Sequence, residues 1–398
     1  MLGLASLIAP LTVEDFLRNF WGRRAVYIPA TEGKFSGLFG WDDVNAYLNS
    51  AREGQPGFRL VHEKTALPPQ ALDKLDEWLA KGATLAINSV NQIDEVIKRF
   101  SQALGADLNT VINTNCYISC PAKQGFDNHF DEHDVFVLQT EGRKAWKVFQ
   151  PTLTYPLHAQ QLTSKGAPPD SDPYIECVMS PGDVLFIPRG HWHYAVAESP
   201  SVHLTIGPAS RAGVEFLVWL SRQLMHSQEF FRQDFPVAGA AAFGGPMPAE
   251  TLDAHLASFR QHVIDLMNSP ALNEALVSWV MESNPVKRTR QLPQAWFFAS
   301  RLSEDTAVEI PPVQKTVVRY DVETGQAVIH VRGQQLHLAG MPEALMDPLF
   351  GRAGVPFTGR ALLAACPEFS WDQLRELLLQ LYANGLLEVS EGDATVVV

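Results

Sequence analysis

The sequence predicts an α+β protein with a β-rich region first, a helical region next and a smaller mixed region last. Residues 1–208 hold many short runs rich in Val, Ile, Phe or Tyr, each bounded by Gly, Pro, Asp or Asn. Residues 209–304 carry apolar positions at helical spacing. Residues 305–398 combine a strand–turn–strand pattern with two helical patterns. We therefore expect three domains with these bounds.

The bulk composition is that of a globular protein. The chain has 398 residues, of which 46% are hydrophobic and 19% are charged, and this length suggests two or three domains. No apolar run of about 18 residues is free of charges and helix breakers, so no membrane span is expected. The formal net charge of −13 argues against a nucleic-acid surface. It is compatible with a basic partner, and equally with a role in solubility alone.

The first region is expected to be a β-sandwich or a β-barrel. A helix start at Thr12 precedes a strand at 23–29. Many short strands at close spacing are typical of sandwiches and barrels. The further strands are expected at 85–89, 111–119, 134–139, 144–149, 183–187 and 202–206.

The middle and last regions are expected to serve association rather than DNA binding. Apolar helical faces in the middle region can pack on one another or on a second chain. In the last region, strands within 317–338 precede helices within 357–366 and 370–389, an order that suggests a winged-helix fold. Residues 306–398 hold six Lys or Arg and eleven Asp or Glu. An acidic winged helix is a poor DNA reader, so a protein-binding or architectural role is expected.

A first candidate for metal ligation lies in DNHFDEHDVFVLQ (127–139). His129 and Asp131 are two residues apart, and alternate side chains of a strand share a face. Both can therefore reach one ion, although such a triplet alone is a weak signal. His133 would share this face if the strand extends that far.

A second and more specific candidate is PGDVLFIPRGHWHYA (181–195). It has the form Gly182-x5-Pro188-x-Gly190-x2-His193, which matches the second motif of the cupin superfamily at every fixed position. In that motif a strand runs down the barrel wall, a Pro-x-Gly turn redirects the chain, and the histidine returns into the barrel mouth. The spacing selects His193 over the neighbouring His191.

Together the two motifs supply two imidazoles and one carboxylate. This set is the facial triad of non-haem iron(II) oxygenases, in which three protein ligands leave the opposite face open for a bidentate 2-oxo acid and dioxygen. A closed four-ligand zinc site is disfavoured because no thiol lies near the motifs. The four cysteines form neither paired CxxC motifs nor a disulfide framework, which fits reduced thiols in a cytoplasm.

Longer segments resemble one family. The HFD triplet, VFVLQTEGRKAWKVF and GDVLFIPRGHWH are similar to the JmjC-type ribosomal oxygenases, and FLRNFWGRRAVYIP (16–29) resembles their opening helix and strand. The resemblance covers essentially the whole chain. It implies a double-stranded β-helix (a JmjC/cupin jelly-roll barrel), a helical dimerisation region and a C-terminal winged helix. It also implies an Fe(II) enzyme that uses 2-oxoglutarate and O2 to hydroxylate a protein side chain, Arg or His of a basic ribosomal protein, as a homodimer.

The resemblance also implies further site residues. Lys144 lies fifteen residues after His129, where the family places the cation that pairs with the distal carboxylate of 2-oxoglutarate. Arg143 should point to the other face of that strand. Asn115 and Tyr117 fit the family's polar pair near the co-substrate. The family's bacterial arginine hydroxylases carry Arg where this chain has Lys144, which favours the Lys-bearing branch.

Other functions fit the same residues. Hydroxylation of a natural-product precursor peptide and N-methyl demethylation use the same metal chemistry. A non-catalytic cupin and winged-helix module that recruits a protein partner is an alternative from another class. The intact triad and Lys144 favour an enzyme over that module.

Overall fold

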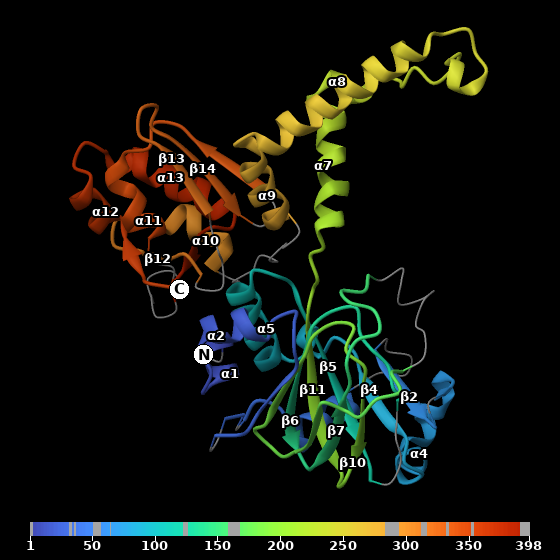
Figure 1. The fold of residues 1–398 in the computed structure, drawn as a ribbon. Helices are drawn as coiled ribbons and strands as arrows, with labels where there is room; N and C mark the ends of the chain where they lie inside the picture. The colour runs from blue at the N-terminus through green and yellow to red at the C-terminus, as the bar shows by residue number, and fades with distance from the viewer. Residues whose placement is uncertain are drawn as a thin grey trace. The chain divides into compact units, whose positions relative to one another are not determined.

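The computed structural model describes most of the chain. The described residues are 3–31, 34–35, 37–50, 57–63, 65–121, 126–157, 168–282, 294–311, 317–331, 334–351 and 354–390. The chain divides into two compact units, Met1–Ser210 and Arg211–Val398 (Figure 1). The three-domain division expected from the sequence stays a prediction. No helix in the described part is long and apolar enough to cross a membrane.

The first unit is built on two antiparallel sheets, as expected of a sandwich or barrel (Figure 1). The larger sheet has the strand order β1-β9-β6-β11-β5-β4-β2-β3, and the smaller has the order β10-β7-β8. The strands are β1 (Val26–Ile28), β2 (Phe58–His62), β3 (Thr65–Ala66), β4 (Thr84–Ile87), β5 (Ile112–Ser119), β6 (Val135–Glu141), β7 (Lys144–Val148), β8 (Ile175–Met179), β9 (Val184–Ile187), β10 (His193–Ala197) and β11 (Ser201–Pro208).

Two apolar layers hold the larger sheet in place. On its inner face, Val137 and Leu185 pack with Trp146 of the smaller sheet. On its outer face, Phe136 and Phe186 pack with Phe16 and with other apolar side chains of the helices. Both faces of β6 and β9 are buried, so the runs Val135–Leu138 and Val184–Ile187 are apolar without alternation. The helices are α1 (Leu4–Ile8), α2 (Val13–Asn19), α3 (Trp41–Ser50), η1 (Pro69–Lys74), α4 (Leu75–Ala80), η2 (Val90–Gln92) and α5 (Glu95–Leu108).

The strands expected from the sequence are observed with small shifts of their ends, and α2 starts after Thr12, whose hydroxyl accepts from the Asp15 N–H. We did not predict β2, β3, β8 or β10. β8 mixes Glu and Cys with apolar residues, and β10 begins within a turn motif rich in polar residues. Both strands are formed by pairing with β7 rather than by a strong local pattern.

A buried carboxylate fixes the turn before β9. Asp183 is 4% exposed and accepts hydrogen bonds from the Ala30 N–H at 2.6 Å, the Ser180 N–H at 2.7 Å and the Tyr27 hydroxyl at 2.9 Å. It thereby joins β1 to the start of the second sequence motif, directly before β9. Burial and the adjacent Asp183 raise the pKa of Tyr27 to about 12, so its hydroxyl stays a donor.

We expect Asp183→Ala to destabilise the first unit strongly. The substitution leaves three partly buried donors without their acceptor, which costs about 2–3 kcal/mol of unfolding free energy. Chemical denaturation monitored by circular dichroism measures the loss. The matched control is Asp73→Ala at an exposed position, which should change stability by less than about 0.5 kcal/mol. Equal stability of the two variants would contradict this role of Asp183.

The second unit begins with helices and ends with a region that contains both strands and helices (Figure 1). Its three-stranded sheets have the orders β16-β12-β17 and β13-β14-β15. The elements are α7 (Gly213–Ser227), η3 (Glu229–Arg232), η4 (Ala241–Phe243), α8 (Ala249–Asn268), α9 (Ala271–Glu282), α10 (Gln294–Arg301), β12 (Ala307–Glu309), β13 (Val317–Asp321), β14 (Gln326–Val331), β15 (Gln334–Leu338), η5 (Glu343–Leu345), α11 (Met346–Phe350), β16 (Phe357–Thr358), α12 (Gly359–Ala365), α13 (Trp371–Ala383) and β17 (Glu388–Val389).

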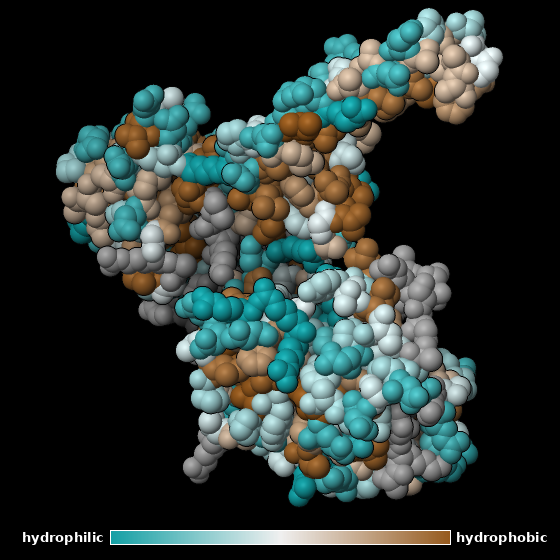
Figure 2. Space-filling model, in the orientation of Figure 1, coloured by the Kyte–Doolittle hydropathy of each residue, from teal (hydrophilic) through white to brown (hydrophobic). Residues whose placement is uncertain are grey.

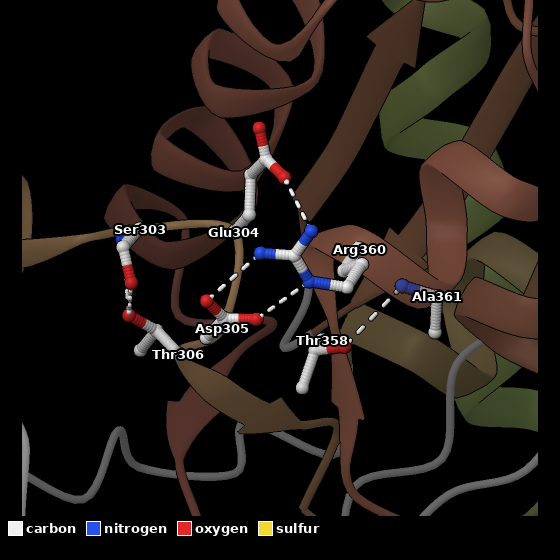
Figure 3. A network of polar contacts seen from close by, with 7 residues as sticks. All are labelled: Ser303, Glu304, Asp305, Thr306, Thr358, Arg360 and Ala361. Atoms are coloured by element: carbon white, nitrogen blue, oxygen red, sulfur yellow. Dashed lines mark hydrogen bonds and ion pairs between the residues drawn. The ribbon is translucent and has the colours of Figure 1, made fainter.

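Caps and ion pairs define the ends of the last helices. The Thr358 hydroxyl accepts from the Ala361 N–H at the start of α12 (Figure 3). Arg360 joins this turn to the segment before β12 through a bidentate pair with Asp305, at 2.7 and 3.0 Å, and through Glu304 at 3.5 Å (Figure 3). Ser370 and Gln373 form the capping box of α13.

Candidate active site

Backbone pairing brings the two sequence motifs together. His129 and His193 form an antiparallel bridge, in which the His193 N–H donates to the His129 carbonyl at 2.7 Å and the His129 N–H donates to the His193 carbonyl at 3.2 Å. The Gly190 N–H also donates to the Asp131 carbonyl at 2.9 Å. Gly190 adopts a φ of 87°, and a Cβ there would lie 2.5 Å from the Leu153 carbonyl, so the Pro-x-Gly turn requires glycine.

The sequence analysis placed His129 and Asp131 on one strand, and this prediction is wrong. Residues 130–134 form no regular secondary structure, with a bend at residues 132–133, and β6 begins only at Val135. His129 and Asp131 therefore do not share a face of one regular strand. The cross-bridge to His193, a long-range contact, sets their positions instead.

The three candidate ligands nevertheless converge. One ligand atom from each of His129, Asp131 and His193 lies within 4.8 Å of the other two, and within the described residues these three make the only such group. The His193 Nε2 lies 3.7 Å from the Asp131 Oδ2, and the two imidazole centroids are 4.5 Å apart.

Both imidazoles are oriented by backbone carbonyls. The His129 Nδ1 lies 2.7 Å from the Asp127 carbonyl, and the His193 Nδ1 lies 3.0 Å from the His191 carbonyl. A carbonyl accepts only, so each Nδ1 donates to its carbonyl, and each Nε2 is the ring nitrogen left to bind a metal. Burial, followed by the nearby His129, lowers the pKa of His193 well below its ordinary value. His193 is therefore neutral, which is the form that binds a metal.

The two competing histidines face elsewhere. The His133 Nδ1 lies 3.0 Å from the Asp134 carbonyl, and its ring packs over Gly207. The His191 Nδ1 lies 2.7 Å from the Tyr174 hydroxyl, and burial lowers the pKa of His191 to about 4. Neither lines the cavity next to the triad.

A cavity of about 330 Å³ extends from the triad into the space between the sheets. The register of β7 with β10 sets its depth, because Val148 pairs with His193, Trp146 with Ala195, and Lys144 with Ala197. Val148 and Lys144 are four positions apart on β7, which corresponds to roughly 13 Å along the strand. The residues lining the cavity include Arg59, Thr84, Tyr117, Ser119, Phe126, His129, Asp131, Lys144, Trp146, His193, Tyr194 and His203.

Lys144 supplies a buried cation at the far end of this cavity. It is 6% exposed, and its Nζ donates to the Ser119 hydroxyl at 3.0 Å and approaches the His203 Nδ1 at 3.5 Å. Burial lowers the pKa of Lys144 to about 7. Arg143 points the other way, as the strand alternation predicts, and its guanidinium lies 3.2 Å from the Glu198 carboxylate at the surface.

Of the expected polar pair, only Tyr117 lines the cavity. Tyr117 lines the cavity and stacks on His203 with ring centroids 5.1 Å apart. Burial, with the nearby Asp131, raises the pKa of Tyr117 to about 12. Asn115 does not line the cavity, because its side-chain oxygen accepts from the Ser89 N–H at 2.9 Å and its side chain hydrogen-bonds Tyr117.

Several lining residues were not predicted. Trp146 lies two residues after Lys144, and Ser119 lies two residues after Tyr117, so strand alternation could have identified both. His203 could not be found in this way. Its position depends on the pairing of β11 with β5, which places it opposite Tyr117.

The pKa of Lys144 predicts how the binding of an anion in this cavity depends on pH. Above pH 7 the ligand-free protein must take up a proton before Lys144 can pair with a carboxylate. The dissociation constant of a dicarboxylate should therefore rise by about tenfold for each pH unit above 7. Calorimetric titration of the metal-loaded protein with 2-oxoglutarate measures this slope.

The control for this prediction is Lys144→Arg. A guanidinium stays charged across this range, so the pH slope should flatten in the variant. An equal slope in both proteins would assign the titration to another group.

Comparisons with known proteins agree with this geometry. Residues 84–215 match the JmjC domain model. The chain is 30% identical over 225 residues to the bifunctional lysine-specific demethylase and histidyl-hydroxylase NO66 of Drosophila pseudoobscura pseudoobscura, covering 51% of this chain and 22% of that protein. It is 30% identical over 220 residues to ribosomal oxygenase 1 of Homo sapiens, covering 52% and 34%. The chain thus spans about a quarter to a third of the length of these two relatives.

Solved structures share the fold over nearly the whole chain. The ribosomal oxygenase YcfD of Escherichia coli superposes with a TM-score of 0.62 at 18% identity, covering 96% of this chain and 98% of that one. YcfD in complex with cobalt and 2-oxoglutarate gives a TM-score of 0.62 at 19% identity, with 96% and 99% covered. The expected JmjC/cupin fold is therefore confirmed. The match of residues 84–215 to the JmjC domain model agrees with the resemblance of the two motifs to JmjC-type ribosomal oxygenases.

Proposed function

We propose that this chain is an Fe(II)- and 2-oxoglutarate-dependent oxygenase that hydroxylates an amino-acid side chain of a protein. The observation that carries the proposal is the layout of one cavity. Two imidazoles and a carboxylate converge at one end, and a buried lysine lies at the other. A 2-oxo diacid has the matching layout, with a metal-chelating end and a distal carboxylate.

The donor set fits iron(II). His129 and His193 present Nε2 atoms whose partner Nδ1 atoms are held by carbonyls, and Asp131 supplies the oxygen. Two imidazoles and one carboxylate on a single face are the ligands of non-haem iron oxygenases. When bound, the iron supplies the activation of dioxygen, while the protein orients the substrate and excludes water.

The far end fits the distal carboxylate. An ammonium as buried as that of Lys144 is stabilised by a carboxylate that pairs with it, and Ser119 holds the Nζ in place. Tyr117 lines the same cavity with its hydroxyl protonated, and the Asn115 side chain forms a hydrogen bond with Tyr117. Lys144, Tyr117 and Asn115 are thus proposed to form the co-substrate site, Asn115 indirectly.

The proposed target is Arg or His of a ribosomal protein, and the Lys-bearing branch favours histidine. The relatives named ribosomal oxygenase support this target, as does the net charge of −13, which suits a basic partner. Mass spectrometry of ribosomal proteins from cells with and without this chain tests it. We expect one protein to lose the mass of one oxygen atom in the cells that lack the chain. Formaldehyde released from methylated peptides, with no such mass change, would instead indicate demethylation.

We further propose that residues 209–304 form a dimerisation region and that residues 305–398 form a winged helix. α11, β16, α12, α13 and β17 follow one another in a winged-helix order, and β12 pairs with both β16 and β17. The acidic charge of the last region disfavours DNA and suits a protein-binding or architectural role. The four cysteines are free, which supports the proposal of a cytoplasmic protein.

An apolar stripe on α7 supports the homodimer. Val214, Leu217, Val218 and Met225 are each about half exposed, and their spacing places them on one face of the helix. Brown surface over α7 and α9 in Figure 2 shows the apolar character of this part of the second unit. Contiguous exposed apolar surface of this kind marks association sites.

We expect the double substitution Leu217→Glu and Val218→Glu to convert a dimer into a monomer, because two buried charges would oppose association. Sedimentation velocity measures the mass. Gln223→Glu is the matched control, since it adds a charge to the same helix at an exposed polar position. A wild-type chain that sediments as a monomer would contradict the dimer.

A further inference from the structure

Trp146 carries a buried donor that lacks an acceptor. It is 6% exposed and lines the cavity between the triad and Lys144. Among the described residues, no atom accepts a hydrogen bond from its Nε1. An indole N–H is only a donor, and when it is buried it usually finds a partner. The absence of a protein acceptor therefore indicates that a ligand supplies one.

The register places this indole beside the path of a ligand that spans the cavity. Trp146 pairs with Ala195. This pair lies midway along the strands, two residues from the Val148–His193 pair and two residues from the Lys144–Ala197 pair. Its ring centroid is 6.2 Å from that of His193 and 6.0 Å from the Lys144 Nζ. Ala195, the cross-strand partner of Trp146, and Ala197, the partner of Lys144, also line the cavity.

The hydrogen-bond capacity of Lys144 leaves room for a second donor. An ammonium has three N–H groups, of which one points to the Ser119 hydroxyl and another to the His203 Nδ1. One N–H remains for a ligand. A carboxylate has two oxygens, so Lys144 with this one bond leaves the second oxygen in need of another donor.

We propose that the Trp146 Nε1–H donates to the same distal carboxylate that Lys144 neutralises. Lys144 then neutralises the charge of the carboxylate, and the hydrogen bond from the indole N–H fixes the orientation of the carboxylate. This inference rests on the proposed function, because it requires a 2-oxo diacid in the cavity. It makes Trp146 a determinant of the choice between 2-oxoglutarate and 2-oxo acids without a second carboxylate.

The direct test observes the indole itself. In the Zn(II)-loaded chain with 15N-labelled tryptophan, Trp146→Phe identifies the Trp146 indole signal among those of the nine tryptophans. We expect saturating 2-oxoglutarate to move this proton downfield, and 2-oxobutyrate, which lacks the distal carboxylate, to leave it nearly unchanged. Equal shifts with both ligands would overturn the proposal.

Calorimetry of both ligands completes the test. Trp146→Phe should raise the dissociation constant of 2-oxoglutarate by roughly tenfold, since one hydrogen bond to a charged group is lost. The dissociation constant of 2-oxobutyrate should stay within about twofold, because that ligand makes no such bond. Unchanged 2-oxoglutarate binding in Trp146→Phe overturns this inference alone. Failure of the wild-type chain to bind 2-oxoglutarate overturns the proposed function as well.

Discussion

Replacing Asp131 by alanine is expected to abolish turnover while the fold is retained. Asp131 is the only anionic member of the triad, and its side chain is partly exposed to the cavity. Its loss leaves two imidazoles, which bind Fe(II) too weakly to hold it during turnover. We expect activity to fall by a factor of about 1,000 or more, as is typical when a catalytic group is removed. His129→Ala should behave in the same way.

The matched control for this prediction is His133→Ala. His133 lies two residues from Asp131, but its ring faces Gly207 and stays outside the cavity. The control should bind Fe(II) as the wild type does, and circular dichroism should show that all variants are folded. Near wild-type activity of Asp131→Ala, in a protein that binds one Fe(II), would move the metal site elsewhere.

Replacing Lys144 by methionine is expected to raise the dissociation constant of 2-oxoglutarate by roughly 100-fold, because the distal carboxylate would be buried without a cation. The same change should raise the melting temperature. The folded-state pKa of about 7 lies below the ordinary 10.5, so between these values the unfolded chain binds more protons and stability rises with pH. Burial of this lysine therefore costs stability at neutral pH, and methionine removes that cost.

Lys147→Met provides the control, since Lys147 lies on the opposite face of the same strand and pairs with Glu176 at the surface, 2.9 Å away. It should leave the affinity for 2-oxoglutarate unchanged and the melting temperature nearly so. Calorimetry and thermal denaturation at pH 7.5 measure both quantities. A Lys144→Met variant that binds 2-oxoglutarate like the wild type would remove Lys144 from the co-substrate site.

Local patterns predicted the parts of the site that depend on short-range geometry. The spacing from Gly182 to His193 describes a strand, a turn and a returning side chain, and the structure contains all three. Alternation along one strand also predicted that Lys144 faces inward and Arg143 outward. These predictions need only neighbouring residues, because the strand period of two is a property of the backbone.

Long-range pairing determined the parts that could not be predicted. His129 and Asp131 are placed by the bridge to His193, and no local pattern in residues 127–134 reveals it. Asn115 shares a strand face with Tyr117, but it does not line the cavity. Its side-chain oxygen instead accepts a hydrogen bond from the Ser89 N–H. His203 joins the site only because β11 pairs with both β5 and β6.

The most direct measurement of the central claim is the conversion of 2-oxoglutarate to succinate by the purified chain, with ribosomal proteins as substrate. The proposed site predicts succinate formation that requires Fe(II), is stimulated by the protein substrate and is lost in Asp131→Ala. A chain that binds no Fe(II) and forms no succinate with any protein or peptide fraction would contradict the oxygenase assignment.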